Sequence, residues 1–312
     1  MDERTIAIEN EILRVRSGSH LYGTNTEKSD EDFISIFIPT EDYLLGLNNI
    51  EQVDLGTEDK NELGKNTEDA IDCISYTLEK FVRLALQNNP NILELLFVNK
   101  ANIIRINSIG EELLSLTNDF LSEESIRKRF IGYAYAQKSK MIIKTGNYEE
   151  IVAAIQLLED SQVKWLNDLP VIAPLVRVKD YIKVGDIRFQ ANLTKKSALK
   201  ILRDRATHFG WRTELIKKFG YETKFASHLI RLLIECIELL ETGTLSFPLK
   251  NRYLLLEIKE GRYSLEETLQ RATNLEDYIR ALDHHKLKGK KSDFHKVNNF
   301  LIETHWNSIC YC

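Results

Sequence analysis

Two aspartates stand two residues apart at the start of a segment that has the pattern of a buried strand. Asp30 and Asp32 lead into the β-branched and aromatic segment 33–38, which ends at Pro39. Side chains at positions i and i+2 of a strand point to the same face, so we expect the two carboxylates to converge. Like charges that close repel each other unless a cation lies between them. The pattern therefore predicts a metal-binding edge on a β-sheet, and Mg²⁺, which prefers oxygen ligands, is the best candidate.

A Gly-Ser pair precedes these carboxylates, at the end of another predicted strand. The segment 12–17 alternates apolar and polar residues, Gly18 and Ser19 follow it, and ten residues separate the pair from the first aspartate. A glycine lets backbone amides approach an anion, and a serine hydroxyl adds a donor. Taken alone, the acidic stretch 27–32 is more typical of a solvated turn. Taken with the Gly-Ser pair, it predicts a site for a nucleoside triphosphate and its metal ions.

The Gly-Ser pair, the ten residues after it and the Asp-x-Asp pair resemble the GS-x(10)-DxD signature of the DNA polymerase β-type nucleotidyltransferase superfamily. The resemblance is closest to the stand-alone branch associated with RNA repair in bacteria and phages. It covers residues 10–100 well, returns near 130–141 and at 221–269, and is weak over 142–220. The segments that carry it are RSGSHLYGT at 16–24, SDEDFISIFIPTEDYLLGL at 29–47, YTLEKFVRLALQNNPNILELLF at 76–97 and KFASHLIRLL at 224–233.

The resemblance implies a mechanism and assigns roles to the motif residues. An acceptor hydroxyl would attack the α-phosphate of a nucleoside triphosphate in line. Asp30 and Asp32 would bridge two Mg²⁺ ions, for which Mn²⁺ is a possible substitute. Gly18 and Ser19 would hold the β- and γ-phosphates. These four residues are the core of the expected site.

A third carboxylate lies inside another apolar strand pattern, AIDCISY at 70–76. Two-metal transfer needs a carboxylate beside the Asp-x-Asp pair, to help hold the metal ion that activates the acceptor hydroxyl. Asp72 fits this role because an unpaired carboxylate in a buried strand is costly unless it binds something. Glu68 and Asp69 are the alternatives, in which case Asp72 merely ends a loop.

A helical pattern places three basic side chains on one stripe. Lys224, His228 and Arg231 are spaced i, i+4 and i+7 within a segment that belongs to the resemblance. A solvated stripe is the usual meaning of such spacing, and the alternative is contact with the nucleotide phosphates across a cleft. On the second meaning, replacing Arg231 with Ala should cost activity without unfolding the protein, because a polar stripe contributes little to a core. Glu94 is predicted to be structural and to pair with a basic group near the site.

The segment 282–296 contains five lysines and three histidines. A solvated surface loop is the common meaning of such a segment. The functional alternative is a strip that contacts the phosphate backbone of an acceptor RNA. On that alternative Lys288, Lys290 and Lys291 are the candidate acceptor-binding residues.

The patterns together predict an α+β protein with two parts. Residues 1–106 are expected to form a small nucleotidyltransferase palm, which is a mixed sheet with helices, including a helix over 77–89. Residues 107–312 have mainly helical patterns. A β-hairpin is inserted near 180–194, and a basic helix is expected over 195–206. A chain of 312 residues is long enough for both parts.

The expected function is transfer of a nucleoside monophosphate from an NTP to an acceptor hydroxyl, with an RNA or tRNA end as the first candidate. A protein or small-molecule hydroxyl is the alternative acceptor. A non-catalytic, antitoxin-like module is an alternative of another class. The net charge of -5 gives no global nucleic-acid-binding surface, so any basic surface must be local.

The sequence also predicts a compartment. The N-terminus is acidic and lacks an apolar segment, and no apolar run approaches the roughly 18 residues of a membrane span. The four cysteines are scattered, which is typical of a reducing compartment. We therefore expect a cytoplasmic protein without membrane contact, whose partners are an NTP and RNA. The oligomeric state is left open.

Overall fold

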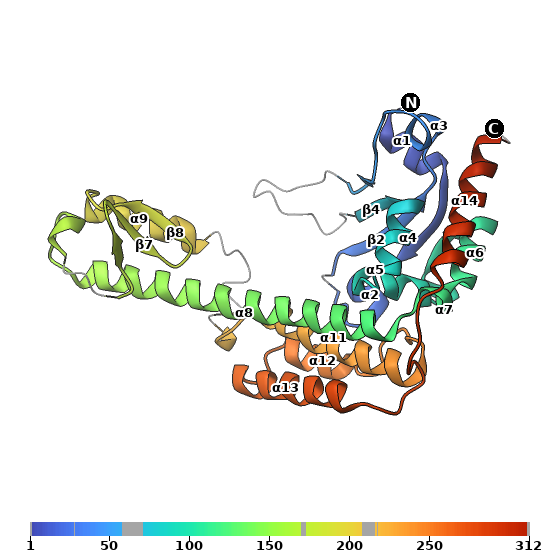
Figure 1. Cartoon of the computed structure of the whole chain (residues 1–312). Helices are drawn as coiled ribbons and strands as arrows, with labels where there is room; N and C mark the ends of the chain where they lie inside the picture. Colours follow the sequence, from blue (N-terminus) through green and yellow to red (C-terminus); the bar gives the residue numbers. More distant parts are fainter. Residues whose placement is uncertain are drawn as a thin grey trace. The chain divides into compact units, whose positions relative to one another are not determined.

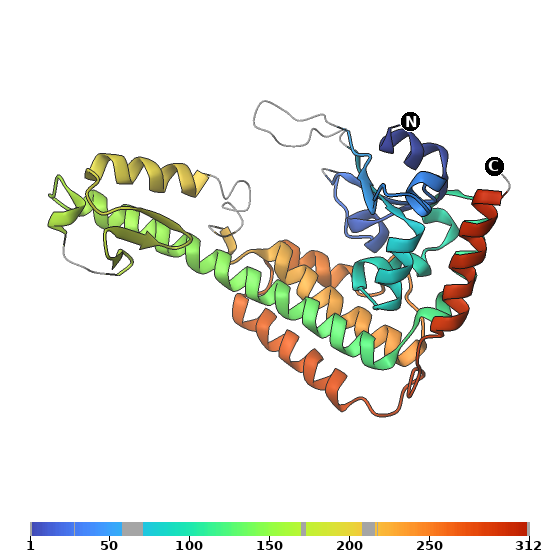
Figure 2. The ribbon, with the colours of Figure 1, turned by 45° about the horizontal axis from the view of Figure 1, so that its top comes forward.

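The structure, a computed structural model, contains two compact units (Figure 1, Figure 2). The long helices α8 (Glu123–Asp160), α11 (Thr223–Thr242) and α13 (Leu265–Ala281) contribute residues to both units. The boundary predicted after residue 106 falls at the end of a strand, whereas the units are discontinuous in sequence. Unit 1 comprises Met1–Tyr133, Arg231–Leu256 and Thr273–Cys312, and unit 2 comprises Ala134–Ile230 and Glu257–Ala272. The described residues are 2–27, 29–57, 71–169, 173–207, 216 and 218–310.

A five-stranded mixed sheet lies at the centre of unit 1, with the strand order β3-β4-β2-β1-β5. Strands β2 and β4 run parallel, and the other neighbours run antiparallel. The α+β class and the mixed N-terminal sheet are therefore confirmed. The strands are β1 (Glu11–Arg16), β2 (Glu31–Phe37), β3 (Gln52–Asp54), β4 (Ile71–Thr77) and β5 (Ile103–Ile106).

A helix follows β4 directly and packs against β2 and β4. This helix, α4 (Leu78–Leu86), begins where the Thr77 hydroxyl accepts a hydrogen bond from the backbone N–H of Lys80 (3.3 Å). Phe81 and Val82 are buried, on the face that the helical pattern predicts. The helix expected in this region is confirmed.

A buried chain of polar side chains joins three strands of the sheet. The carboxylate of Glu11 on β1 accepts hydrogen bonds from Ser35 Oγ on β2 (2.6 Å) and from Arg14 Nε (2.7 Å). Ser75 Oγ on β4 donates to Ser35 Oγ (3.1 Å). Because buried polar groups need partners, these bonds favour the one strand register in which all of them form.

Helices complete unit 1, and α14 (Phe294–Cys310) packs against α4 and α7. Within the described part of the chain, no helix is both long and apolar enough to cross a membrane. The other elements are α1 (Glu3–Glu9), α2 (Gly18–Tyr22), α3 (Glu41–Leu44), α5 (Pro90–Leu93), η1 (Glu94–Phe97), η2 (Lys100–Asn102), α6 (Ser108–Ser115) and α7 (Thr117–Phe120), together with α12 (Arg252–Lys259), which begins in unit 1 and ends in unit 2.

Unit 2 contains a small sheet packed on two helices, which we call the sheet module (the described residues of 147–207). Its strands have the order β6-β7-β8 and are antiparallel, and α9 (Lys195–Thr207) follows them. The predicted hairpin and the predicted basic helix are therefore confirmed. The strands are β6 (Val176–Val178), β7 (Tyr181–Val184) and β8 (Ile187–Gln190), and the core includes Ile151, Leu158, Ile182, Val184, Phe189 and Leu202.

The turn of this hairpin lies against α8. Gly185 has a φ of +54°, and a Cβ built on it would lie 2.8 Å from the carbonyl oxygen of Asn147. The backbone N–H of Gly185 donates to Glu150 Oε2 (2.8 Å). A glycine is needed here because the backbone is left-handed and the helix is close.

Candidate active site

The turn from β1 into α2 brings the Gly-Ser pair against the Asp-x-Asp pair. The backbone N–H of Ser17 donates a hydrogen bond to the carbonyl oxygen of Asp32 (2.8 Å). Gly18 has a φ of +62°, and a Cβ built on it would lie 2.1 Å from Asp32 Oδ2. A side chain there would displace the carboxylate, so this approach needs a glycine. Two motifs that are separate in the sequence therefore meet at one point.

Asp32 and Asp72 lie side by side on parallel strands. They are direct partners in the pairing of β2 with β4, so their side chains point to the same face. Asp32 is half-buried and Asp72 is exposed. Asp30 is also exposed and comes just before β2. The structure thus places Asp72 beside Asp32, while the alternatives Glu68 and Asp69 lie outside the described residues.

These carboxylates have the chemistry that Mg²⁺ prefers. Among the residues that the structure describes, no three Asp, Glu, His or Cys side chains are arranged to hold a metal ion by themselves. Mg²⁺ usually takes only one or two carboxylates and completes its octahedral shell with water and substrate phosphates. The Asp32–Asp72 pair, beside the close approach at Gly18, fits this mode of binding.

A buried ionic cluster joins the Gly-Ser helix α2 to α11. Tyr22 OH donates to Glu94 Oε1 (2.7 Å), and Arg231 Nη1 donates to Glu94 Oε2 (2.8 Å). The same Nη1 contacts both carboxylate oxygens of Glu235, at 3.0 and 3.1 Å. All four residues are at most 8% exposed. One guanidinium therefore serves two carboxylates away from water.

Burial raises the pKa of both carboxyl groups in this cluster. The pKa of Glu94 lies above its ordinary value because desolvation disfavours the charged form, although Arg231 and the Tyr22 hydroxyl act in the opposite sense. Burial raises the pKa of Glu235 to about 8, again against the attraction of Arg231. Desolvation therefore outweighs the guanidinium in setting the direction of both pKa shifts.

The cluster and a neighbouring loop fix the position of α2. The guanidinium of Arg231 lies over the ring of Tyr22, 4.3 Å from its centroid, and the Tyr22 carbonyl accepts a hydrogen bond from the backbone N–H of Leu249 (3.1 Å). Gly23 ends the helix with a φ of +71°, and a Cβ there would lie 2.7 Å from Pro248 Cβ. The helix that carries Gly18 is thus held by residues far along the chain.

Arg231 does not lie on a solvated stripe. Its guanidinium contacts Glu94 and Glu235 in the interior. The expectation that its replacement would leave the fold intact is therefore wrong, because two buried carboxylates would lose their cation. Glu94 has the structural role predicted for it and pairs with a basic group. The i, i+4 spacing of Arg231 and Glu235 was a usable signal, whereas no sequence pattern singled out Tyr22.

Comparison with known proteins identifies the family. The model of RlaP, the RNA repair pathway DNA polymerase beta family, matches residues 4–303. The chain belongs to this family. A 38.9 kDa protein of Enterobacteria phage T4, from the nrdC-mobD intergenic region, is 23% identical over 300 residues, which cover 86% of this chain and 88% of the phage protein. The resemblance to the RNA-repair-associated branch is confirmed, and the RlaP match also covers residues 142–220.

The RlaP family is of the DNA polymerase β-like nucleotidyltransferase type, and its description names RNA repair.

Two residues of the basic stripe, Lys224 and His228, lie in unit 2 and are half-buried. Burial and then the positive charge of Lys224 lower the pKa of Lys259, so the two lysines lie near each other. Contact of Lys224 and His228 with a nucleotide stays a prediction for this RlaP protein.

The lysine-rich segment is a surface loop that is tied to the start of α8. The carboxylate of Glu123 contacts His285 Nε2 (2.9 Å). Lys288 and Lys291 are exposed, and Lys290 is half-buried. The structure therefore agrees with a solvated loop, and contact of the three lysines with RNA stays a prediction.

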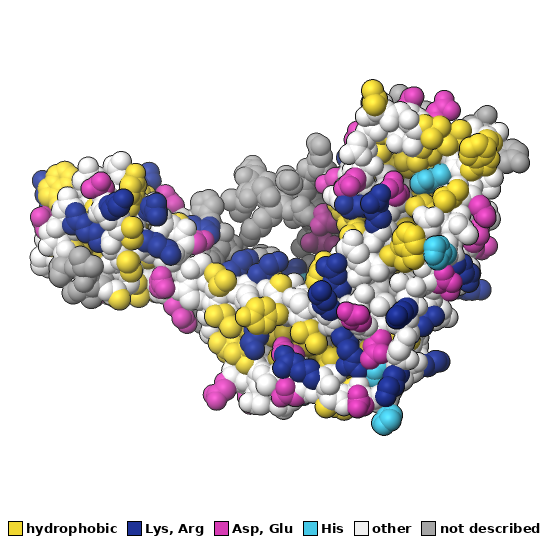
Figure 3. All heavy atoms as spheres, in the orientation of Figure 1, with side chains coloured by type: hydrophobic (Ala, Val, Ile, Leu, Met, Phe, Trp, Pro, Cys, Tyr) yellow, Lys and Arg dark blue, Asp and Glu magenta, His cyan; other side chains and the backbone are white. Residues whose placement is uncertain are grey.

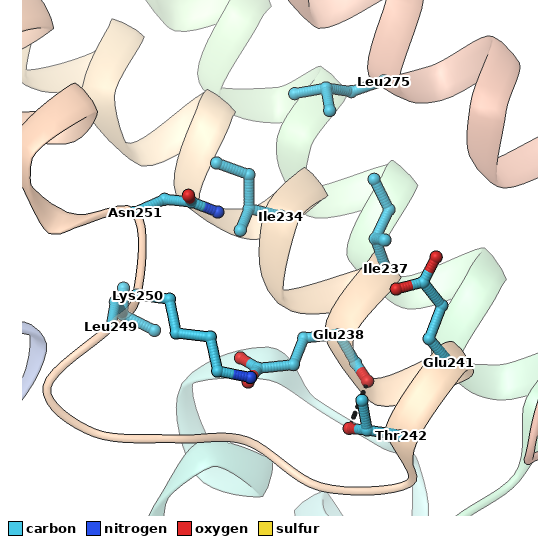
Figure 4. A pocket seen from close by; sticks show the side chains of 9 residues that line it. All are labelled: Ile234, Ile237, Glu238, Glu241, Thr242, Leu249, Lys250, Asn251 and Leu275. Carbon is cyan, nitrogen blue, oxygen red and sulfur yellow. Dashed lines mark hydrogen bonds and ion pairs between the residues drawn. The ribbon is translucent and has the colours of Figure 1, made fainter.

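A pocket of about 300 Å³ in unit 1 contains none of the predicted site residues (Figure 4). Lys250 Nζ contacts Glu238 Oε1 (2.8 Å), and Glu241 accepts a hydrogen bond from Tyr278 OH (2.6 Å). Its charged groups are thus engaged within the protein, and the remaining lining is mainly apolar. The lining residues are Ile234, Ile237, Glu238, Glu241, Thr242, Leu249, Lys250, Asn251 and Leu275.

Proposed function

We propose that this RlaP protein transfers a nucleoside monophosphate from an NTP to the hydroxyl of an RNA end, tRNA ends included. The observation that best supports this function is the approach of Gly18 to Asp32, beside Asp72. Transfer of a charged group requires mainly positioning and charge neutralisation. A backbone turn that can approach phosphates, next to paired carboxylates, supplies both.

Each residue has its own role in this proposal. Asp30 and Asp32 hold two divalent ions, Mg²⁺ or Mn²⁺, which when bound neutralise the triphosphate and lower the pKa of the acceptor hydroxyl. The backbone N–H of Gly18 and the hydroxyl of Ser19 donate to the β- and γ-phosphates. Asp72 would help to hold a divalent ion, orients the acceptor hydroxyl and accepts its proton as the oxygen attacks the α-phosphate in line. The bond from the α-phosphorus to the oxygen that bridges to the β-phosphate breaks, and pyrophosphate leaves.

RNA is the proposed acceptor because the family description names RNA repair. A protein or small-molecule hydroxyl would need the same carboxylates, so these residues do not separate the acceptors. A non-catalytic, antitoxin-like module would have no use for two carboxylates in register at a solvent-exposed strand end. The proposed location is the cytoplasm, which agrees with the free thiols of Cys73 and Cys236.

A labelling experiment tests the function and the acceptor together. The protein is incubated with Mg²⁺ and each NTP in turn, labelled at the α-phosphate, with total cellular RNA in one set and with RNase-treated lysate in the other. Label that enters RNA supports the proposal. Label that enters only protein or small molecules would replace the RNA acceptor. The absence of label from every fraction would contradict nucleotidyl transfer.

Ser19→Ala tests the phosphate-binding role. The hydroxyl is proposed to donate to a charged phosphate, so its loss should weaken NTP affinity by about tenfold. The rate of transfer at saturating NTP should fall less than it does when an aspartate of the site is replaced. Affinity is measured by titration with a fluorescent NTP analogue, and Ser115→Ala, an exposed serine of α6, is the matched control. An affinity equal to that of the control would remove Ser19 from the site.

A further inference from the structure

The three-stranded sheet of the sheet module has one buried face and one exposed face. Ile182, Val184 and Phe189 point inward and pack with residues of α8 and α9. Alternate positions of a strand point to the opposite face. The outward residues are Val176, Val178, Tyr181, Lys183, Arg188 and Gln190, and all six are exposed.

Two cations lie directly opposite each other on this exposed face. Lys183 on β7 and Arg188 on β8 are partners in the antiparallel register. Like charges in this position destabilise a sheet. The three strands, whose residues the structure describes in full, contain no Asp or Glu. The face therefore has the charge of an anion-binding surface, and bound anions would relieve the repulsion.

The carboxylates nearest in sequence lie in the turns. Asp186, in the β7–β8 turn, is bound by Arg205 of α9, with 3.2 Å between Oδ1 and Nε, and this bond holds the pKa of Asp186 below its ordinary value. Asp180 lies in the β6–β7 turn and is exposed. Neither residue belongs to the strands that form the face, so the positive charge of Lys183 and Arg188 dominates there.

An aromatic ring lies beside the two cations. Tyr181 is 41% exposed, and the guanidinium of Arg188 lies 5.5 Å from the centroid of its ring. Gln190 is the register partner of Tyr181 and offers an amide donor and acceptor. An exposed aromatic ring with adjacent cations is the combination that stacks a nucleobase and binds the phosphates next to it.

The surrounding segment is strongly positive within an acidic chain. Residues 161–207 contain ten Lys and Arg and four Asp, a net charge of +6, whereas the whole chain has -5. Lys and Arg side chains gather beside hydrophobic ones on the displayed face of the sheet module (Figure 3). Charge complementarity therefore favours a polyanion, and the exposed Tyr181 favours one that carries bases.

We propose that the exposed face of β6–β8, with Tyr181, Lys183 and Arg188 at its centre, binds the single-stranded segment of the acceptor RNA. The identification of this RNA as the acceptor rests on the proposed function. Lys183 and Arg188 contact successive phosphates, the ring of Tyr181 stacks on a base, and Gln190 bonds to a base edge. A flat exposed sheet suits an extended polymer better than it suits a small anion.

Binding is measured with the full-length protein in EDTA and without NTP, so that transfer does not interfere. The probe is a fluorescein-labelled single-stranded RNA of about 20 nucleotides, longer than the usual single-strand binding site. The anisotropy titration is repeated at several salt concentrations. Lys183→Gln/Arg188→Gln should raise the Kd by about tenfold or more and reduce the slope of log Kd against log salt by about 1.4.

Two matched controls separate the face from the total charge. Lys100→Gln/Lys128→Gln removes two exposed lysines of unit 1 and should leave Kd and slope nearly unchanged. Tyr181→Ala should raise the Kd on the order of tenfold with little change in slope. Tyr253→Ala, which removes an exposed tyrosine of unit 1, should have no comparable effect.

The result also separates this inference from the proposed function. RNA binding that depends on the face, in a protein that transfers no nucleotide, would support the face and contradict the function. Transfer to RNA with binding that the face variants do not change would contradict the face alone. Polyglutamate that competes as well as unlabelled RNA would assign the face to an acidic protein and overturn the proposal.

Discussion

Each of the two sheets sets a pair of like charges side by side in register, but the pairs differ in sign and in place. Asp32 and Asp72 are partners at one end of the parallel strands β2 and β4, beside the turn at Gly18. Lys183 and Arg188 are partners within the exposed face of a hairpin. A strand end next to a tight turn forms a small, localised site, which suits metal ions and phosphate groups. An open face is a surface, which suits a polymer.

The buried pair Glu94 and Glu235 is a third case, in which the chain supplies the opposite charge itself through Arg231. Burial makes that cation obligatory, because charges away from water must be paired. The other two pairs are half-buried or exposed, so their charges are not enclosed in this way. Burial thus separates the like-charge pair that the chain neutralises internally from the two pairs that we propose to bind substrates.

The largest expected effect comes from the carboxylate pair at the strand ends. Asp32→Asn keeps the shape of the side chain and removes its charge, so we expect transfer to fall on the order of 10³–10⁴-fold, about 4–5 kcal/mol. Stability should not fall, because repulsion with Asp72 is relieved. Single-turnover labelling measures transfer, with Asp42→Asn on α3 as control. A transfer rate within about tenfold of the wild-type rate would contradict the proposed metal-binding role of Asp32.

Removing the internal cation should have the next largest effect, and on stability. Arg231→Met keeps the length of the side chain and leaves two buried carboxylates without a cation, so we expect a loss of about 3 kcal/mol or more in the free energy of unfolding. Urea unfolding measures it. Lys224→Met on the same helix should change stability by only about 0.5 kcal/mol.

A rescue variant sharpens this test. Adding Glu94→Gln and Glu235→Gln to Arg231→Met removes the buried negative charges, so part of the lost stability should return. A triple variant no more stable than Arg231→Met would show that packing, rather than charge, explains the loss.

A smaller effect is expected from Gly18→Ala. The new Cβ would lie 2.1 Å from Asp32 Oδ2 at a φ of +62°. The carboxylate must therefore move. We expect kcat/KM for transfer to fall roughly thirtyfold, which corresponds to a rise of about 2 kcal/mol in the activation free energy. Gly132→Ala is the matched control, since nothing lies within 4 Å of its added Cβ in α8, and it should stabilise the helix by about 0.5–1 kcal/mol. Equal activities of the two variants would contradict the close approach.

The smallest effect, counted per pH unit, is that of pH on stability. The pKa of Glu235 is raised to about 8 in the folded protein, above its ordinary value, so its protonated form contributes stability at low pH. That contribution is complete below about pH 4.5 and is lost as the pH rises through 8, by at most about 1.4 kcal/mol per pH unit. Glu235→Gln should flatten the fall between pH 5 and about 8 in urea unfolding. Parallel curves for the two proteins would contradict the shift.

Local patterns predicted much of unit 1. The alternating segment 12–17 forms β1, and the β-branched and aromatic segment 33–38 forms most of β2. Because β1 and β2 are neighbours, the Gly-Ser pair that follows β1 lies beside the Asp-x-Asp pair at the start of β2. The placement of Asp72 also followed from a strand pattern, since parallel pairing with β2 sets it beside Asp32. Periodicity sufficed where one strand or turn decides the geometry.

Periodicity failed where the surroundings of one helix change along its length. Lys224, His228 and Arg231 occupy one stripe of α11, but the first two are half-buried in unit 2 while the third is buried in unit 1. Which neighbours cover each turn of a long helix depends on segments distant in sequence, here α2 and η1. For the same reason the discontinuous units could not be read from the order of patterns.

The buried hydrogen bonds among Glu11, Ser35 and Ser75 affect which fraction of the folded molecules is active. If β2 slipped by one residue against β1, Asp32 would turn to the opposite face, and Glu11 would lose the buried hydrogen bond from Ser35. The register error that destroys the site would thus also destabilise the molecule. Chains that fold incorrectly in this way should unfold and be degraded, so that few intact but inactive molecules compete for the same substrates.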